Sequence, residues 1–312
     1  MTSTPDVAQV LPVLRVIVGP TAAGKSALAL HLAQNVGASV VSADSRQVYR
    51  GFDIGTAKPT ADDLARVPHF GVNVALPTER FSASQWADGT RHWLQQIAGS
   101  GRSPLIVGGT GFYIRALVEP LVSLPPLDVS RRDRLANELA SLTTDELRRW
   151  CTALDPARSS LGRTQLRRAI ETALLSGQRL SDLHRTAGRA PRAAARYLLL
   201  DPGAALGARI VGRVEAMLDA GWLTEVTRLA EALPPDAPAW SATGYDVLRA
   251  VAAGELSLDE AVGRIIVATR QYAKRQRTWF RHQLAAEAVT RLDPTQAGAQ
   301  EIALAWWHGE NV

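Results

Sequence analysis

Residues 19–26 read Gly-Pro-Thr-Ala-Ala-Gly-Lys-Ser, after an apolar run at 13–18 and before a segment with helical spacing at 25–34. The spacing Gly-x-x-x-x-Gly-Lys-Ser is typical of a loop whose backbone N–H groups wrap a phosphate at a helix N-terminus. Lys25 and the Ser26 hydroxyl would then contact the outer phosphate oxygens and a Mg²⁺ cofactor. The motif predicts a di- or triphosphate site. It leaves open which phosphate compound binds and whether a P–O or a C–O bond breaks.

The composition is that of a globular protein. At 312 residues and 46% hydrophobic content, the chain is long and apolar enough to bury a sizeable core. The single cysteine, Cys151, excludes an intramolecular disulfide. The longest early apolar run, at 10–18, contains Pro12 and Arg15, which makes it too short and too interrupted to span a bilayer. We expect a cytoplasmic monomer with no membrane partner.

The charge of the chain is weakly informative. A formal charge of +5 and a pI near 9.8 suit a polyanionic partner, although many proteins with such values never bind nucleic acid. Of the 35 Lys and Arg residues, only Lys25, Lys58 and Lys274 are lysine. A lysine retained in such a chain suggests a site that requires a compact ammonium group rather than a planar guanidinium.

Two further apolar runs end in small or polar residues. Residues 38–41 precede Ser-Ala-Asp-Ser at 42–45, and residues 105–107 precede Gly-Gly-Thr-Gly at 108–111. Strands of a parallel sheet end in this way at the carboxyl edge, where α/β proteins bind ligands. The sequence therefore predicts an α/β fold, a P-loop-type parallel sheet flanked by helices, with three strand ends meeting at one crevice.

The middle of the chain has a different character. Prolines mark a break at 120–126, and Arg-rich amphipathic helices are predicted at 129–140, 144–151 and 164–175. Residues 198–201 indicate a return to the sheet. We predict a first part of the core at 1–119, a helical insertion at 120–196, and core completion with C-terminal helices at 197–312. The remainder of that last part is predicted to be helical, with a proline-rich loop at 233–242.

A long helix is predicted to begin at a capping box, Ser-Leu-Asp-Glu at 257–260. Its core face includes Tyr272 and Gln276, while a second face carries cations at steps of four, three and four residues: Arg270, Lys274, Arg277 and Arg281. That row could follow a phosphate backbone. The alternative is a solvated face in an arginine-rich protein.

Asp44 is the candidate for chemistry at the second strand end. In a kinase or ATPase, an aspartate at this place would bind Mg²⁺. Together with Gln47, Asp44 offers acceptors and an amide that suit an adenine edge or the removal of a proton from an amine. The structural alternative is that Asp44 caps the helix that follows it.

Seven motifs in order resemble the tRNA dimethylallyltransferase (tRNA isopentenyltransferase) family. They are Gly-Pro-Thr-Ala-x-Gly-Lys-Ser (19–26), Ser-Ala-Asp-Ser-Arg-Gln-Val-Tyr-x-Gly (42–51), Asp-Ile-Gly-Thr-Ala-Lys-Pro (53–59), Gly-Gly-Thr-Gly-Phe-Tyr (108–113), Arg-Ile-x-x-Arg (209–213), Gly-Tyr (244–245) and Thr-Arg-Gln-Tyr-Ala-Lys-Arg-Gln-x-Thr-Trp-Phe (269–280). Seven ordered motifs are far more specific than the 19–26 loop alone.

The resemblance implies transfer of a dimethylallyl group from dimethylallyl diphosphate to N6 of the adenine at position 37, beside the anticodon of tRNA. It implies Asp44 as general base and Thr110 as a catalytic hydroxyl. The diphosphate ligands implied are Gly19, Thr21, Ala22, Ala23, Gly24, Lys25, Ser26 and Arg209, with Ser26 also holding the metal. The implied contacts to the tRNA anticodon stem-loop are Ser45, Arg46, Gln47, Arg132, Gln165, Arg167, Arg168, Lys274 and Arg277.

The sequence departs from the family pattern at two places. Phe70 and Asn73 replace a histidine and an aspartate, and Leu161-Gly162 replaces Asn-Asp. Both departures bear on substrate fit. Three alternatives remain open: a P-loop small-molecule kinase, an isopentenyltransferase acting on free adenine nucleotide, and a non-catalytic RNA-binding module. The kinase leaves the insertion and the cationic helix unused, and the RNA-binding module leaves the 19–26 loop, Asp44 and Thr110 unused.

Overall fold

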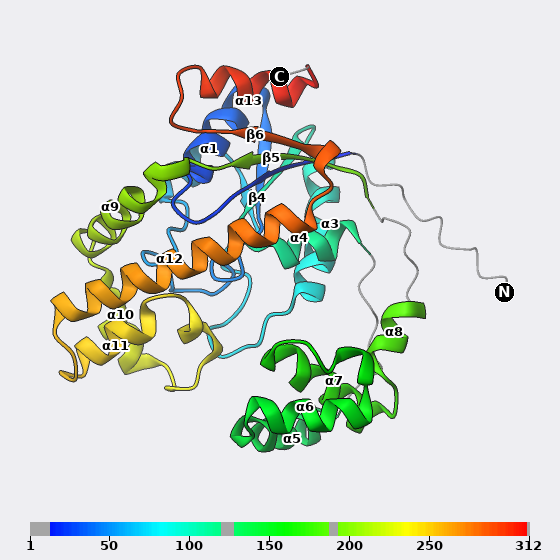
Figure 1. Cartoon of the computed structure of the whole chain (residues 1–312). Coiled ribbons are helices and arrows are strands. Elements are labelled where there is room, and N and C mark those ends of the chain that lie inside the picture. The colour runs from blue at the N-terminus through cyan, green and yellow to red at the C-terminus, as the bar shows by residue number, and fades with distance from the viewer. Residues whose placement is uncertain (1–12, 120–127, 187–192, 311–312) are drawn as a thin grey trace. The chain divides into compact units, whose positions relative to one another are not determined.

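The computed structural model describes residues 13–119, 128–186 and 193–310 (Figure 1). Its core is a six-stranded parallel sheet in the order β3-β2-β4-β1-β5-β6. The strands are β1 (Leu14–Val18), β2 (Ala38–Ser42), β3 (His69–Phe70), β4 (Ser103–Gly108), β5 (Ala195–Leu200) and β6 (Val289–Leu292). The predicted α/β class and parallel sheet are confirmed.

The register of the central strands brings the predicted strand ends together. Val18 at the end of β1 is paired with Gly108 of β4, and Ser42 at the end of β2 is paired with Val107. Because all strands run in the same direction, the loops after β1, β2 and β4 leave the sheet at one edge. The predicted crevice is therefore built from three segments that are far apart in sequence.

Helices cover both faces of the sheet. Helices α1 (Lys25–Val36) and α13 (Ala299–His308) pack on the face that includes Ile17, Leu105 and Leu198, with Trp306 in the same core. Alternate strand residues point to the other face. There α3 (Ala83–Gly99) packs on β2 and β4, and the indole N–H of Trp86 donates to the Ser42 carbonyl oxygen at 2.9 Å.

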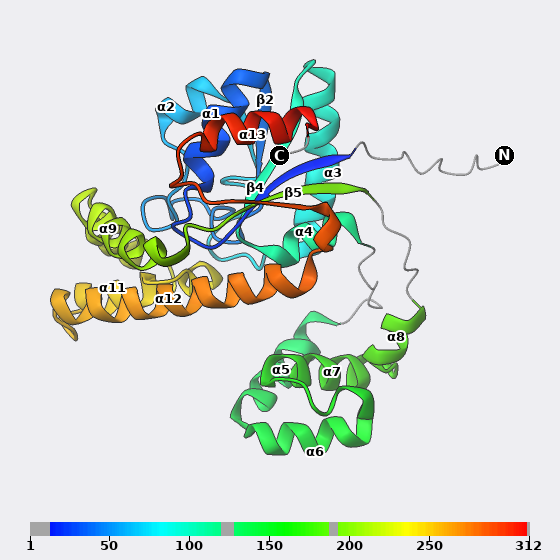
Figure 2. The ribbon, with the colours of Figure 1, turned by 45° about the horizontal axis from the view of Figure 1, so that its top comes forward.

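The remaining helices of this unit are α2 (Ala61–Arg66), α4 (Gly111–Val118), α9 (Leu206–Asp219), α10 (Trp222–Ala232), α11 (Tyr245–Ala252) and α12 (Leu258–Gln283). Figure 2 shows α9, α11 and α12 beyond the ends of the strands, and α2 near α1. As predicted, α12 begins after Ser257, whose hydroxyl accepts from the Glu260 N–H at 3.3 Å. Within the described residues, no helix is both long and apolar enough to cross a membrane.

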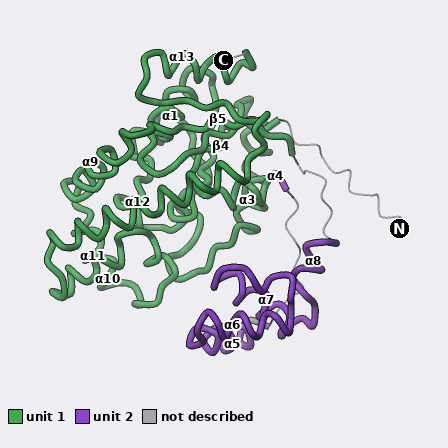
Figure 3. Tube along the Cα trace, in the orientation of Figure 1, with its two compact units in different colours: residues 1–118, 192–312 green, residues 119–191 purple. Residues whose placement is uncertain are grey.

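Residues 119–191 form a second compact unit, while residues 1–118 and 192–312 form the first (Figure 3). The helices of the second unit are α5 (Val129–Ser141), α6 (Thr144–Leu154), α7 (Arg163–Ser176) and α8 (Leu180–Thr186). It has its own core, which includes Leu139, Leu147, Cys151 and Ile170. The three helices predicted here are confirmed to within three residues at their ends. The prolines predicted to mark the break lie outside the described residues.

Two strands differ from the sequence prediction. The prediction that the C-terminal part is helical throughout is wrong at β6, and β3 was not predicted. Both are short edge strands: β6 has four residues and contains Thr290 and Arg291, so its own pattern carries little strand signal. What makes it a strand is pairing with β5, at Leu198↔Thr290 and Leu200↔Leu292. In addition, β5 begins at Ala195, three residues before the predicted run.

Gly108 gives a test of how closely the strand ends approach. A Cβ atom at this position would lie 2.1 Å from the carbonyl oxygen of Ala43, and backbone cannot move aside as a flexible side chain can. We expect Gly108→Ala to lower the free energy of unfolding by about 1–3 kcal/mol, measured by urea denaturation. Gly263→Ala is the control, because Gly263 lies within α12 with open space around its Cβ direction and should gain up to about 1 kcal/mol. Equal stability of the two variants would contradict the close approach.

Candidate active site

The 19–26 loop connects β1 to α1 and has the backbone of an anion cradle. Gly24 adopts φ +91° immediately before α1, a conformation that favours glycine, and Ala22 also has a positive φ of 62°. Helix α1 begins at Lys25 without a side-chain cap. The first N–H groups of α1 therefore remain available for an anionic ligand at the positive end of the helix.

Three cations surround this loop. The Lys25 ammonium donates to the Pro20 carbonyl oxygen at 2.8 Å, and the Arg209 Nε–H donates to the Ala22 carbonyl oxygen at 2.8 Å. Burial, together with the nearby Arg213 guanidinium, lowers the pKa of Lys25 to about 7. The pKa of Arg213 is also lowered, chiefly by burial. Two cations that repel each other in this way favour an anion between them.

Gln276 joins the 19–26 loop to the 108–111 loop. Its side-chain oxygen accepts from the Thr21 N–H at 2.8 Å, and its side-chain N–H donates to the Gly109 carbonyl oxygen at 2.9 Å. The residue is buried on α12. A Cβ atom on Gly109 would lie only 2.2 Å from the Gln276 amide nitrogen, so the bridge requires glycine at that position.

Thr110 is held against the loop that follows β2. Its hydroxyl oxygen accepts from the Ser45 N–H at 3.0 Å and lies 3.3 Å from the Ser45 hydroxyl, and its own N–H donates to the Ala43 carbonyl oxygen at 3.1 Å. Tyr272 of α12 also hydrogen-bonds with Thr110, and burial raises the pKa of Tyr272 to about 12. Tyr272 therefore stays protonated at neutral pH.

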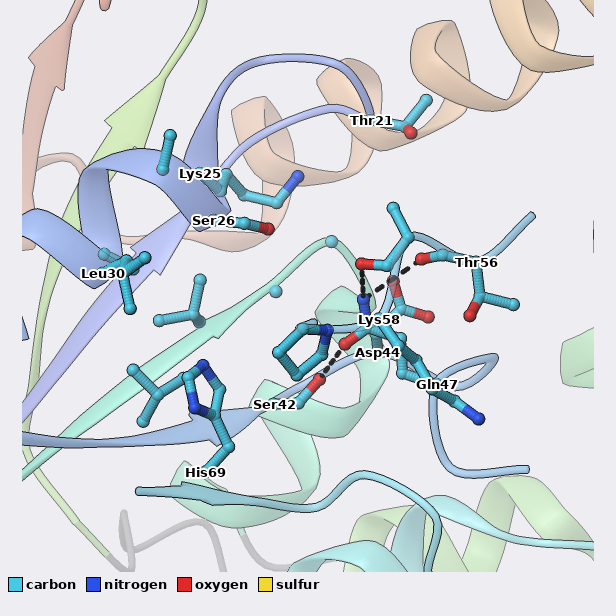
Figure 4. Close-up of a pocket in the computed structure, with 18 of the residues that line it drawn as sticks. Thr21, Lys25, Ser26, Leu30, Ser42, Asp44, Gln47, Thr56, Lys58 and His69 are labelled. Atoms are coloured by element: carbon cyan, nitrogen blue, oxygen red, sulfur yellow. Dashed lines mark hydrogen bonds between the residues drawn. The ribbon is translucent and has the colours of Figure 1, made fainter. Parts of the chain in front are cut away.

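Asp44 does not cap a helix, because residues 45–48 form a turn and Tyr49 then forms an isolated β-bridge with Ala75. One carboxylate oxygen accepts from the Arg46 N–H at 2.8 Å. The negative charge of the same carboxylate partly opposes the lowering of the pKa values of Lys25 and Arg213, so Asp44 lies within electrostatic range of both cations. Figure 4 shows Asp44 and Lys25 lining one pocket. An acceptor and an anion-binding loop thus face the same space.

Gln47 is committed to the protein itself. Its amide N–H groups donate to the carbonyl oxygens of Thr56 and Ala57 at 3.1 and 2.9 Å, and its oxygen accepts from the Ser42 hydroxyl at 2.8 Å. In this conformation Gln47 shapes the pocket wall. Among the described residues, Arg46 has one side-chain hydrogen bond, which its guanidinium donates to the Ser241 hydroxyl at 2.6 Å.

The 53–59 loop is fixed by two buried polar groups. The Lys58 ammonium donates to the Tyr49 carbonyl oxygen, to Asp53 at 2.7 Å and to Asn73 at 2.6 Å. The Glu225 carboxylate accepts from the Ile54 N–H at 2.9 Å and from the Tyr245 hydroxyl at 2.6 Å. The departure at Asn73 therefore keeps an oxygen for Lys58 and removes one negative charge beside it.

Two cavities meet at the edge of the sheet. The larger, about 400 Å³, is lined in part by the 19–26 loop, and the smaller, about 60 Å³, is lined by residues of the C-terminal helices, such as Trp222 and Ile265, and by residues of the loops that follow β1 and β2. They share the following lining residues: Thr21, Asp44, Thr56, Arg213 and Tyr272. The sequence singled out Asp44 and Thr21, but assigned no site role to Arg213, Tyr272 or Gln276, although all three lie in the quoted motifs.

The predicted tRNA contacts other than those at 45–47 fall into two groups. On α12, Lys274 is exposed, whereas Arg277 pairs with Asp201 and donates to the Gly203 carbonyl oxygen at 2.8 Å. In the second unit, Arg132 lies 3.8 Å from Glu171, and Arg167 donates to the Ala136 carbonyl oxygen at 2.7 Å.

Two more predicted tRNA contacts lie on α7 of that unit. The Gln165 side-chain oxygen accepts from the Gly162 N–H at 3.1 Å, so Gln165 caps the N-terminus of α7. This is also the place where Leu161-Gly162 departs from the family pattern. The pKa of Arg168 is lowered, first by burial and then by Arg132. This arginine-rich surface remains a predicted contact region.

Known proteins resemble this chain over most of its length. Residues 47–283 match the family described as IPP transferase, and residues 12–70 match that described as isopentenyl transferase. A protein of Anaeromyxobacter sp. (strain Fw109-5) named tRNA dimethylallyltransferase is 44% identical over 286 residues, which cover 88% of this chain and 94% of that protein.

Solved structures agree in fold. The full-length tRNA isopentenylpyrophosphate transferase of Bacillus halodurans is 30% identical with a TM-score of 0.68, covering 96% of each chain. A eukaryotic dimethylallyltransferase acting on tRNA has a TM-score of 0.79 at 23% identity, covering 97% of this chain and 81% of that chain, and so shows the fold alone. These matches place the chain among the α/β enzymes that transfer prenyl groups. It belongs to the IPP transferase family.

The low pKa of Lys25 gives a test of the anion site. Near pH 8 the free protein holds Lys25 mostly neutral, and a bound diphosphate would stabilise the ammonium and raise its pKa. Binding should then take up about 0.9 proton at pH 8 and about 0.1 at pH 6, measured with inorganic diphosphate by calorimetry in buffers of different ionisation enthalpy. The affinity contribution of Lys25 should fall as the pH rises above 7.

Lys25→Arg is the control, since its guanidinium stays charged over this range. The uptake that remains in Lys25→Arg reports the titration of diphosphate itself. If the two proteins take up the same number of protons at pH 8, Lys25 does not titrate in the anion site.

Proposed function

We propose that this protein transfers a dimethylallyl group from dimethylallyl diphosphate to N6 of the adenine at position 37, beside the anticodon of tRNA, and releases diphosphate. The observation that carries the proposal is the meeting of the two cavities at Asp44, Thr21 and Tyr272. One cavity contains an anion-binding loop, and the other combines aromatic and apolar side chains, such as Trp222 and Ile265, with polar groups that include Asp44 and Thr269. Such a pair suits a diphosphate ester on one side and a nucleobase on the other.

Breaking the C1–O bond places negative charge on the departing oxygen. Preorganised donors at that position stabilise the transition state most, because the charge appears only as the bond breaks. Lys25, the N–H groups at the start of α1 and the Arg213 guanidinium surround the space where the diphosphate would lie. Thr110, set by Ser45 and Tyr272, would meet the region between the diphosphate and the amine.

A magnesium ion fits the donor set as a partner of the diphosphate. Ser26 brings an exposed hydroxyl to the large cavity, which Asp44 also lines. The described residues contain no cluster of three metal-binding side chains, so phosphate oxygens and water would complete the coordination. Bound there, Mg²⁺ would neutralise charge on the leaving group.

The exocyclic amine of adenine is a poor nucleophile, because its lone pair is delocalised into the ring. As N6 bonds to C1, a base must take one of its protons. Asp44 is the carboxylate shared by both cavities, and one of its oxygens remains free of the Arg46 N–H. We therefore assign to Asp44 the role of the base that accepts the N6 proton.

The adenine must leave its stack in the anticodon loop to reach this base, at a cost of about a few kcal/mol. The small cavity, at about 60 Å³, has room for only a few water molecules. Entry of a base therefore requires lining side chains to move. Arg46 lines that cavity and is held by its bond to Ser241 at the surface, so it is the residue we expect to move.

The experiment that tests the proposal uses Mg²⁺ and labelled dimethylallyl diphosphate with one of two acceptors, an anticodon stem-loop with adjacent adenines or free AMP. A third reaction contains ATP and no acceptor. Transfer to the stem-loop supports the proposal. Transfer to AMP alone would assign the free-nucleotide activity. ATP hydrolysis without prenyl transfer would assign the kinase class.

Asp44→Asn separates chemistry from binding. The amide keeps the size of the side chain but cannot accept a proton, so the single-turnover transfer rate should fall by about 10²–10⁴-fold. The affinity for tRNA, measured by fluorescence anisotropy, should stay within about twofold. A variant that reacts at the wild-type rate would remove Asp44 as the base.

Lys274 and Arg277 should respond differently, because among the described residues a partner is found for Arg277 and none for Lys274. For Lys274→Ala, the plot of log association constant for tRNA against log salt concentration should become less steep by about one unit of slope. The urea midpoint of unfolding should be unchanged. Arg277→Ala breaks the pair with Asp201 and should also lower the urea midpoint. An unchanged salt slope for Lys274→Ala would assign that residue to a solvated face.

A further inference from the structure

The large cavity extends beyond the groups that the proposed reaction uses. From Ser26 it follows α1 to Leu30, four residues or about 6 Å along the helix. From Ser42 it follows β2 back to Val40, which is paired with His69 of the edge strand β3. We call this extension, lined by Ala29, Leu30, Val40 and His69, the side arm.

The walls of the side arm are hydrocarbon, and His69 brings an imidazole into it. Figure 4 shows the ring of His69 on the same side of the pocket as Leu30, away from Thr56 and Asp44. Asp63 also lines this region, but its two oxygens accept from the Thr60 N–H at 3.0 Å and from Arg66 at 2.8 Å. The oxygens of Asp63 are thus used within the protein, although its charge still acts on His69 and opposes the effect of burial on the pKa of that ring. His69 supplies the ring nitrogen that faces a ligand in the side arm.

The protonation of His69 follows from its backbone contact. Nδ1 lies 2.7 Å from the Val67 carbonyl oxygen, which can only accept, so Nδ1 carries the hydrogen. In the neutral ring Nε2 is then an acceptor. Burial lowers the pKa of His69, which favours this neutral form. Among the described residues no hydrogen-bond partner of Nε2 is found.

A purely hydrocarbon chain in the side arm would cover Nε2 without satisfying it. A buried acceptor left without a donor costs free energy, whereas a hydroxyl group at the end of the chain would supply the donor. The side arm starts beside the loop that would hold the diphosphate, and its length matches a five-carbon chain. Shape and polarity therefore point to the same ligand.

Resting on the proposed function, we propose that the side arm holds the hydrocarbon chain of the allylic diphosphate and that His69 Nε2 selects a chain with a hydroxyl group on its terminal carbon. The transfer step is unchanged. The C1–O bond breaks, the N6–C1 bond forms, Asp44 takes the proton, and diphosphate leaves. The hydroxyl takes no part in the reaction and remains on the transferred group.

The test compares 4-hydroxy-3-methylbut-2-enyl diphosphate with dimethylallyl diphosphate as donors to the same stem-loop. The measured quantity is the ratio of the two kcat/KM values, hydroxylated over plain. We expect His69→Leu to lower this ratio about tenfold, the size of one hydrogen bond, and His69→Gln, which keeps an acceptor, to restore part of it. An unchanged ratio in His69→Leu would overturn the selection by His69.

A second variant tests the side arm itself. Leu30→Trp would fill the arm and should weaken both prenyl diphosphates in calorimetric titrations at least tenfold more than it weakens inorganic diphosphate. Leu258→Ala, at an exposed position at the start of α12, is the matched control for an apolar substitution and should leave all three affinities unchanged. Equal weakening of all three ligands by Leu30→Trp would show that the chain lies elsewhere.

These outcomes are separate from the fate of the proposed function. If the wild-type protein transfers neither prenyl group to any acceptor, the proposed function fails. If it transfers dimethylallyl groups normally but the ratio of the two kcat/KM values is the same in wild type and His69→Leu, only the further inference fails.

Discussion

The side-chain amide of Gln276 is the contact on which the site depends. It links the Thr21 N–H of one loop to the Gly109 carbonyl oxygen of another, across 255 and 167 residues of sequence. Because the amide uses a donor and an acceptor at once, it fixes both the spacing and the orientation of the two loops. Glycine at position 109 is the steric consequence. Helix α12 thereby sets Tyr272, one turn earlier, beside Thr110.

The polar groups around the crevice follow one electrostatic design. Burial and the nearby Arg213 guanidinium lower the pKa of Lys25, and burial lowers the pKa of Arg213, so keeping both groups charged is costly until an anion lies between them. Two nearby carboxylates are already paired: Glu225 with Tyr245, and Asp53 with Lys58. The unmet demand for charge is therefore concentrated at the 19–26 loop. This concentration is why a diphosphate suits the cavity better than a neutral ligand.

Much of the core could be predicted from sequence, because strand ends, glycine spacing and helix caps are local signals. The parallel sheet, the helices of the second unit and the crevice followed from them. What could not be predicted depends on pairing between distant segments: β6 has a weak pattern of its own, and Gln276 looked like an ordinary core residue. Arg277 looked like part of a free cationic row until its pair with Asp201 was seen. The same holds for Gln47, whose amide is used within the protein.

The position of β1 in the sheet has a consequence for the order in which the molecule can fold. β1 lies between β4 and β5, and β5 follows the whole second unit in the chain. During synthesis, β1 therefore has one exposed edge until about residue 200 has left the ribosome, whereas residues 119–191 have their own core and their own local contacts. Non-local pairing of this kind is slow. The inserted unit can thus become compact while the sheet that carries the active site is still incomplete.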